Sequence, residues 1–186
     1  ATHSVDEMAD DLHVFLVHHK LQKVNLLGHS MGGKVAMKFA LDYPDKVDKL
    51  IVADIAPRAY RRGHDEVFDA IFAIDLNKVH SRKEAEEQMK KQLPDDGTRQ
   101  FILKSLERNE DGNYEWKFNI HTLYKDYDEI TKSVNSSIAF TGDVLFLKGS
   151  LSSYIGKEDP EDIRKLFPKA IVQTIENAGH WLHADQ

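Results

Sequence analysis

Gly28-His29-Ser30-Met31-Gly32-Gly33 is the stretch of sequence that decides the fold. It follows a short apolar run at residues 24–27, which predicts a buried strand, and it precedes helical periodicity from residue 32 to residue 43. A G-x-S-x-G sequence between a strand and a helix is typical of a nucleophile elbow, a sharp turn that exposes a serine. We expect Gly28 and Gly32 to make room for this turn and Ser30 to lie at the carboxyl edge of a sheet.

The segments on either side extend this pattern into an α/β fold. Apolar spacing from Val5 to Leu16 predicts a helix before the elbow, with Ser4 and Asp6 near its N-cap. After the elbow helix, which Pro44 ends, an apolar strand follows at residues 50–53. A strand, a helix and a strand in so short a span favour a right-handed crossover and a parallel sheet. Further strands are expected at residues 144–147 and 170–175, with a helix at about 160–167 between them.

The middle of the chain has a different pattern. Charged amphipathic helices are expected at about residues 64–74, 81–93, 98–108 and 123–134, with a Gly112-Asn113 turn before a short segment at 114–118. The predicted division is a core at 1–57, an inserted helical lid at 58–135, and a second core segment at 136–186. Aromatic residues of the insertion either line an acyl pocket or pack in its own core, which their helical spacing favours: Phe68, Phe72, Phe101 and Trp116.

The composition excludes several classes of protein. The chain has 186 residues, a net charge of 25 − 31 = −6 and no cysteine. The acidic balance argues against binding to nucleic acid, and no apolar run approaches the roughly 20 residues of a membrane span. The lack of cysteine excludes disulfides, cysteine-zinc sites and a cysteine nucleophile. We therefore expect a soluble, cytoplasmic globular protein.

A serine nucleophile needs a base, and position favours His180. It lies just past the last predicted strand, in a loop that should face the same sheet edge as Ser30. His183 is the nearest alternative, whereas His29 adjoins the elbow and is expected to be structural. The other histidines considered are expected on the first helix or in the insertion: His13, His18, His19, His64, His80 and His121.

The acid that orients this histidine is predicted to be Asp54. It ends the strand after the elbow helix, where an unpaired carboxylate would be costly to bury. The loop after strand 144–147, a common place for such an acid, has no carboxylate before Glu158, so Glu158 and Asp159 are the alternatives. The Met31 N–H, at the start of the elbow helix, is expected to stabilise an oxyanion.

These segments together resemble the α/β-hydrolase fold. The elbow followed by Lys34-Val35, the segment Asp54-Ile55-Ala56-Pro57 and the segment 177–184 are similar to the YbfF-type esterases and their mitochondrial abhydrolase relatives. The resemblance runs from about Val5 to Asp185, and it also implies Asp54 as the acid. It implies hydrolysis of small-molecule substrates, namely short or medium acyl esters or acyl thioesters, without a metal or another cofactor. It also implies a mitochondrial location if the source is eukaryotic.

The sequence departs from this family at both ends. Family members carry an earlier strand with a His-Gly loop, which supplies a second oxyanion donor, and a helix after the histidine loop. Neither is found here, so we expect an internal piece of a longer protein, with a partial fold and the elbow strand at a sheet edge. Two other functions stay open: acyl transfer to an alcohol (or a lyase reaction) on the same triad, and a non-catalytic hydrolase-like binding protein.

Overall fold

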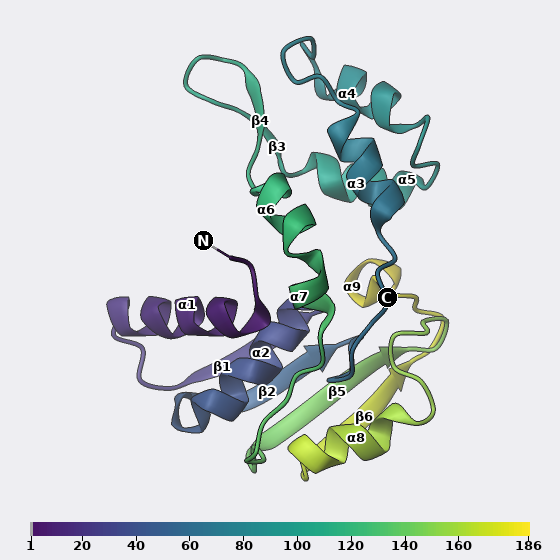
Figure 1. Ribbon diagram of the computed structural model, residues 1–186. Coiled ribbons are helices and arrows are strands. Elements are labelled where there is room, and N and C mark those ends of the chain that lie inside the picture. Colours follow the sequence, from purple (N-terminus) through teal and green to yellow (C-terminus); the bar gives the residue numbers. More distant parts are fainter. Residues whose placement is uncertain (1) are drawn as a thin grey trace. The chain divides into compact units, whose positions relative to one another are not determined.

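The computed structural model describes residues 2–186, so Ala1, the first residue of the predicted core segment, lies outside the described residues. The chain divides into two compact units (Figure 1). The core unit comprises residues 2–60 and 128–186, and the helical unit comprises residues 61–127. Both ends of the predicted insertion, residues 58–60 and 128–135, therefore belong to the core unit. The function of the helical unit as a lid stays a prediction.

The core unit is built on a four-stranded parallel sheet, which confirms the predicted α/β class. Its strands are β1 (Val24–His29), β2 (Val47–Ala53), β5 (Asp143–Gly149) and β6 (Ala170–Ile175), in the spatial order β1-β2-β5-β6. Every neighbouring pair is parallel. The carboxyl ends of all these strands therefore lie along one edge of the sheet, and the loops that follow them meet there.

The helices of the core unit begin and end where local chemistry favours it. Ser4 caps the first helix, because its hydroxyl accepts the Glu7 N–H at 3.1 Å while the Glu7 carboxylate accepts the Ser4 N–H. The elbow helix stops before Pro44, which lacks an N–H for the next turn. Within residues 2–186 no helix is long and apolar enough to cross a membrane. The helical segments of this unit are α1 (Val5–His18), α2 (Met31–Asp42), η1 (Pro44–Lys46), α8 (Asp159–Leu166) and α9 (Leu182–Asp185).

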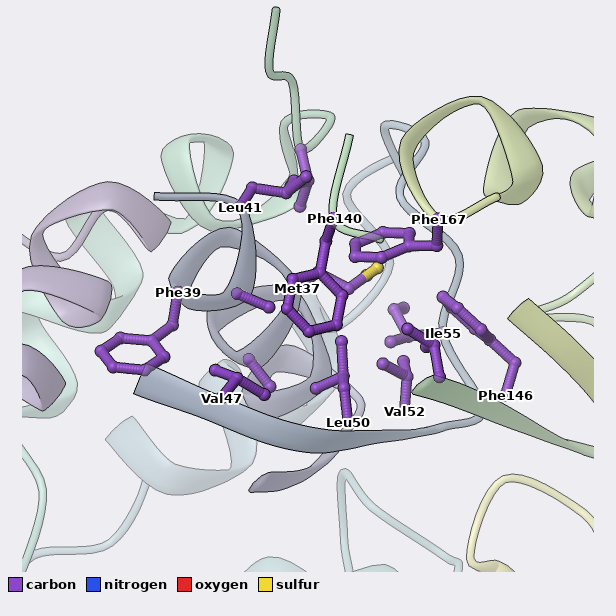
Figure 2. Packing of buried hydrophobic residues seen from close by; sticks show 14 of the residues in the cluster. Met37, Phe39, Leu41, Val47, Leu50, Val52, Ile55, Phe140, Phe146 and Phe167 are labelled. Atoms are coloured by element: carbon purple, nitrogen blue, oxygen red, sulfur yellow. The ribbon is translucent and has the colours of Figure 1, made fainter. Parts of the chain in front are cut away.

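One hydrophobic cluster joins the sheet to α1, α2 and α8. Figure 2 shows Met37 of α2 among side chains of the sheet, with Phe146 of β5 and Phe167, just after α8, close by. Phe146, Phe167 and Met37 are completely buried. Burial of such side chains stabilises a fold by about 1.5–3 kcal/mol each. The strands that carry the loops of the carboxyl edge are therefore firmly held.

The helical unit has a hydrophobic cluster of its own, in which Phe68, Met89 and Leu106 are buried. A helix that begins in it, α7 (Tyr127–Thr131), leads back into the core unit. The other elements of the helical unit are α3 (Asp65–Phe72), α4 (Arg82–Met89), α5 (Asp96–Leu103), β3 (Leu106–Arg108), β4 (Tyr114–Trp116) and α6 (Ile120–Lys125).

Two helices expected in the middle of the chain end differently from the prediction. The helix expected at 98–108 stops at Leu103, because residues 106–108 pair antiparallel with residues 114–116 around the turn at Gly112. The helix expected at 123–134 is divided into α6 and α7, and α7 ends at Thr131. The Thr131 carbonyl accepts hydrogen bonds from the Tyr60 N–H and the Lys34 ammonium. These tertiary hydrogen bonds take the place of the next helical one.

Candidate active site

Ser30 lies in the turn between β1 and α2, at the carboxyl edge of the sheet. Its backbone has φ 54° and ψ −122°, a conformation that costs a non-glycine residue about 1–3 kcal/mol. The turn is fixed to the neighbouring strand, because the Ser30 N–H donates to the Ala53 carbonyl of β2 at 3.0 Å. The serine expected at the strand-to-helix turn is therefore present, and its backbone is strained.

Close backbone packing explains two of the glycines around Ser30. A Cβ at Gly28 would lie 2.2 Å from the Gly32 carbonyl oxygen, and one at Gly33 would lie 2.5 Å from Cγ2 of Ile55. A Cβ at Gly32 would meet no atom within 4 Å. The expectation that Gly32 makes room for the turn is therefore wrong. Gly33, which packs against the segment after β2, has that role instead.

Alanine substitutions at Gly28 and at Gly32 should differ in their effect on the free energy of unfolding. Gly28→Ala should lower the free energy of unfolding by about 1–3 kcal/mol, because the backbone of the elbow must shift to admit a methyl group. Gly32→Ala should leave it unchanged or raise it by up to about 1 kcal/mol, since alanine is the better helix former and its methyl group meets open space. Urea unfolding of both variants measures the difference, and the reverse order would contradict the packing described for the elbow.

Asp54 directly follows β2 and is completely buried. Its φ of 49° turns the chain sharply at the end of the strand. Oδ1 accepts the Gly149 N–H at 3.0 Å, and Oδ2 accepts the hydroxyl of Ser152. Burial alone would raise the pKa of Asp54, but hydrogen bonds from His180, Ser152 and Gly149 outweigh it and leave the pKa below the usual value. The carboxylate is therefore charged at neutral pH although it has no access to water.

His180 follows β6 and lies between the other two side chains. Its Nδ1 is 2.8 Å from Oδ2 of Asp54, and its Nε2 is 2.9 Å from Oγ of Ser30. An ionised carboxylate only accepts hydrogen bonds, so Nδ1 carries the proton and Nε2 of the neutral ring is an acceptor. The Ser30 hydroxyl then donates to Nε2. The three residues predicted from the sequence thus form one continuous series of hydrogen bonds.

The alternative histidines have other surroundings. His29 contacts the His180 carbonyl oxygen through Nε2 at 2.7 Å, and burial lowers the pKa of His29. It therefore supports the backbone of the histidine loop, as expected for a structural residue. His183 packs edge-on against His29, with ring centroids 5.4 Å apart. The other histidines lie where the sequence predicted them. His13, His18 and His19 are on or next to α1. His64, His80 and His121 belong to the helical unit.

The two alternative acids, Glu158 and Asp159, lie in the core unit and have other contacts. Asp159 is buried and forms an ion pair with Arg58, with Nε and Oδ1 3.0 Å apart, and it also accepts the Gly156 N–H. Glu158 is exposed at the N-terminus of α8. Among residues 2–186, Asp54 is the carboxylate that His180 contacts by a hydrogen bond.

Two residues of this site were not anticipated from the sequence. Ser152 donates a hydrogen bond to Asp54 from the loop after β5, the loop that commonly carries the acid. Tyr154 stacks on the imidazole of His180, with centroids 3.9 Å apart and planes inclined by 18°. The signal for Ser152 was the presence of hydroxyl side chains in a loop that faces a buried aspartate. No comparable pattern pointed to Tyr154.

The remaining predicted residues are placed as follows. Met31 is the first residue of α2, where backbone N–H groups have no acceptor within the helix. In the helical unit, Phe68 is buried in its hydrophobic cluster and Trp116 packs against that cluster, whereas Phe72 and Phe101 are exposed. The aromatic residues therefore divide between the core of that unit and its surface.

The sequence matches the family model described as alpha/beta hydrolase fold over residues 2–186. The chain belongs to the α/β-hydrolase family. This membership agrees with the parallel sheet and with a strained serine between strand and helix. It also confirms the resemblance inferred from the elbow and from the segments around Asp54 and His180.

Named relatives are similar to this α/β hydrolase over nearly its whole length. Esterase YbfF of Escherichia coli is 37% identical over 96% of the chain, and sn-1-specific diacylglycerol lipase ABHD11 of Mus musculus is 39% identical over 98%. A solved structure described as a marine microorganism esterase is 44% identical, with a TM-score of 0.94 over 98% of this chain and 73% of that one. The chain spans 68% of the length of the E. coli protein and 61% of the length of the mouse protein. It spans about three fifths of the length of most such relatives.

Proposed function

We propose that this α/β hydrolase is a serine hydrolase that cleaves carboxylic esters with short or medium acyl chains, or acyl thioesters, through an acyl-enzyme. The observation that carries this proposal is the series of hydrogen bonds from Ser30 through His180 to the charged carboxylate of Asp54. The names of the relatives support it, since they describe an esterase and a lipase.

In the first half of the reaction, Ser30 Oγ attacks the acyl carbonyl carbon while its proton passes to Nε2 of His180. Asp54 keeps the proton on Nδ1 and stabilises the imidazolium that forms. The negative oxygen of the tetrahedral intermediate accepts the N–H of Met31, where the helix dipole favours negative charge. The intermediate then collapses: the bond to the leaving oxygen or sulfur breaks, and Nε2 returns its proton to the leaving group.

In the second half, water replaces the leaving group. His180 takes a proton from this water as the water oxygen attacks the acyl-enzyme carbonyl. The bond to Ser30 then breaks, the serine oxygen regains the proton from Nε2, and the acid is released. The residues therefore end in the protonation states in which they began.

The direct test is to treat the folded chain with a fluorophosphonate, map the label by mass spectrometry and assay p-nitrophenyl butyrate on the same sample. We expect the label on Ser30, because only a serine activated by a base reacts readily with this probe, together with release of p-nitrophenol. A folded chain without label, or with the label on another residue, would overturn the proposal. Analysis of the products with ethanol present adds a second criterion, since mainly ethyl butyrate would indicate acyl transfer instead of hydrolysis.

A further inference from the structure

The chain leaves the core unit at Tyr60 and returns to it at Asp128. Within the core unit these two connecting segments are joined by backbone hydrogen bonds. The Tyr60 N–H donates to the Thr131 carbonyl at 2.9 Å, and the Val134 N–H donates to the Pro57 carbonyl at 2.7 Å. The outgoing and the returning segment therefore form one paired structure, and Tyr60 lies at its end.

A buried cation holds this pair to the elbow helix. Lys34, four residues after Ser30, is only 2% exposed, and its ammonium group donates to the carbonyls of Thr131 and Lys132. The same ammonium lies over the Tyr60 ring, 5.0 Å from the ring centroid. The guanidinium carbon of Arg58 also lies over this ring, 4.0 Å from the same centroid. Burial, together with the positive charge of Arg58, lowers the pKa of Lys34 to about 8. Both carbonyls and the electron-rich ring face stabilise this cation and fix the Tyr60 ring.

The hydroxyl of Tyr60 connects this structure to the candidate active site. It accepts the Ala56 N–H at 2.8 Å and donates to the Tyr154 carbonyl at 2.6 Å. Burial raises the pKa of Tyr60 to about 12, so the hydroxyl keeps its proton at neutral pH and stays a donor. A hydrogen bond at each of two backbone groups fixes the hydroxyl in place, and with it the backbone of Tyr154.

Tyr154 in turn touches both the base and the support of the acid. Its ring stacks on His180, and its N–H donates at 3.2 Å to Oγ of Ser152, which donates to Asp54. A shift of the Tyr154 backbone would therefore move the ring against which the imidazole rests. Small displacements of this kind are costly, because misplacement of a reacting group by about 1 Å can cost 10²-fold in rate.

We propose that Tyr60 is a positioning residue for the hydrolysis proposed above: its hydroxyl fixes Tyr154, whose ring holds the imidazole of His180 toward Ser30. The inference rests on the proposed function. Lys34 and the Thr131 carbonyl both contact Tyr60. Tyr60 therefore links the outgoing and the returning segment to His180, the proposed general base.

The test uses Tyr60→Phe in the full chain, which removes the hydroxyl and keeps the ring over which Lys34 lies. We expect kcat for p-nitrophenyl butyrate to fall by about tenfold, with KM within about twofold of the wild-type value, since the hydroxyl acts on the base through Tyr154. We also expect the ring protons of His180 to change their NMR shift, because the shielding by the stacked Tyr154 ring changes. Comparison with His180→Gln assigns these resonances.

Tyr43→Phe is the matched control. The Tyr43 hydroxyl donates to Asp10 at 2.7 Å, also within the core unit. Tyr60→Phe loses the two hydrogen bonds of its hydroxyl and Tyr43→Phe loses one, so a general effect of removing a phenol hydroxyl would act on both. We expect Tyr43→Phe to keep the wild-type kcat and His180 resonances. Wild-type kcat and His180 resonances in Tyr60→Phe, or equal losses in both variants, would overturn the inference.

A second variant keeps the inference testable if Tyr60→Phe fails to fold. Lys34→Met fills the same buried space without a charge and removes the ammonium that fixes the Tyr60 ring and the returning segment. A lower kcat with shifted His180 resonances would support the inference, and unchanged values would overturn it. Absence of turnover in the wild-type chain would instead count against the proposed function, and the NMR comparison would still report on the placement of His180.

Discussion

Ser30→Ala is expected to lower kcat for p-nitrophenyl butyrate by about 10⁶-fold, to the level of the residual reaction, and to abolish fluorophosphonate labelling. The reason is that the substitution removes Oγ, the hydroxyl 2.9 Å from Nε2 of His180 that this nitrogen activates in the proposed mechanism. The fold should survive, because alanine leaves the backbone hydrogen bond from residue 30 to Ala53 in place. Ester turnover, labelling and urea unfolding on the same preparation measure all these effects.

Ser153→Ala is a suitable control for this substitution. Ser153 is exposed in the loop after β5, next to Ser152, so its removal tests a serine close to the site in sequence. We expect this variant to hydrolyse the ester and to take up the probe like the wild type. If Ser30→Ala kept ester turnover in a pure sample, the nucleophile would have to be another residue.

Asp54→Asn is expected to lower kcat by about 10⁴-fold, the loss that accompanies the wrong histidine tautomer in a triad of this kind. The carboxylate accepts hydrogen bonds from Gly149, Ser152 and His180, whereas an amide offers a single acceptor oxygen. At least one of these donors would therefore face an N–H group. The imidazole would lose both its orientation and the charge that stabilises its protonated form, which a kcat measurement on the purified variant detects.

Two carboxylates near α8 serve as controls for Asp54. Glu158→Gln alters an exposed side chain and should change neither kcat nor stability. Asp159→Asn should lower stability, because it weakens a buried ion pair with Arg58, but should leave kcat close to the wild-type value. A larger loss of kcat in Glu158→Gln than in Asp54→Asn would move the acid to the later loop.

Asp54→Asn should also change how the free energy of unfolding depends on pH. The pKa of Asp54 is lower in the folded chain than in the unfolded chain, so the charged carboxylate stabilises the fold above the unfolded pKa of about 4. This contribution is lost as the pH falls through the folded pKa. Urea unfolding below about pH 4 should therefore show a steeper loss of stability for the wild type than for Asp54→Asn, and equal slopes would contradict the charged state of Asp54.

Much of the fold and the main site residues could be predicted because their signals are local. The turn around Ser30 is encoded by a strand, two close-packed glycines and a helix that are contiguous in the sequence. The last strand was predicted with the bounds that β6 has, since its apolar run is short and clearly limited. Asp54 and His180 could be associated with Ser30 only through a general rule, that the loops after parallel strands meet at one sheet edge.

What could not be predicted depends on partners distant in the sequence. The end of α7 at Thr131 depends on hydrogen bonds from Lys34 and Tyr60, which no helical pattern contains. The relative importance of Gly32 and Gly33 became visible only when the atoms around each Cα were known, because Ile55 packs against one of them and not against the other.

The sequence by itself determined the parallel α/β fold, the strained serine and the carboxyl edge at which its partners lie, because periodicity and turn chemistry act over a few neighbouring residues. Only the tertiary structure decided how the acid and the base are held. Ser152 reaches Asp54 across 98 positions, and Tyr60 reaches Tyr154 across 94. Such contacts arise when separate strands deliver their loops to one place, and their geometry depends on the packing of the whole core unit.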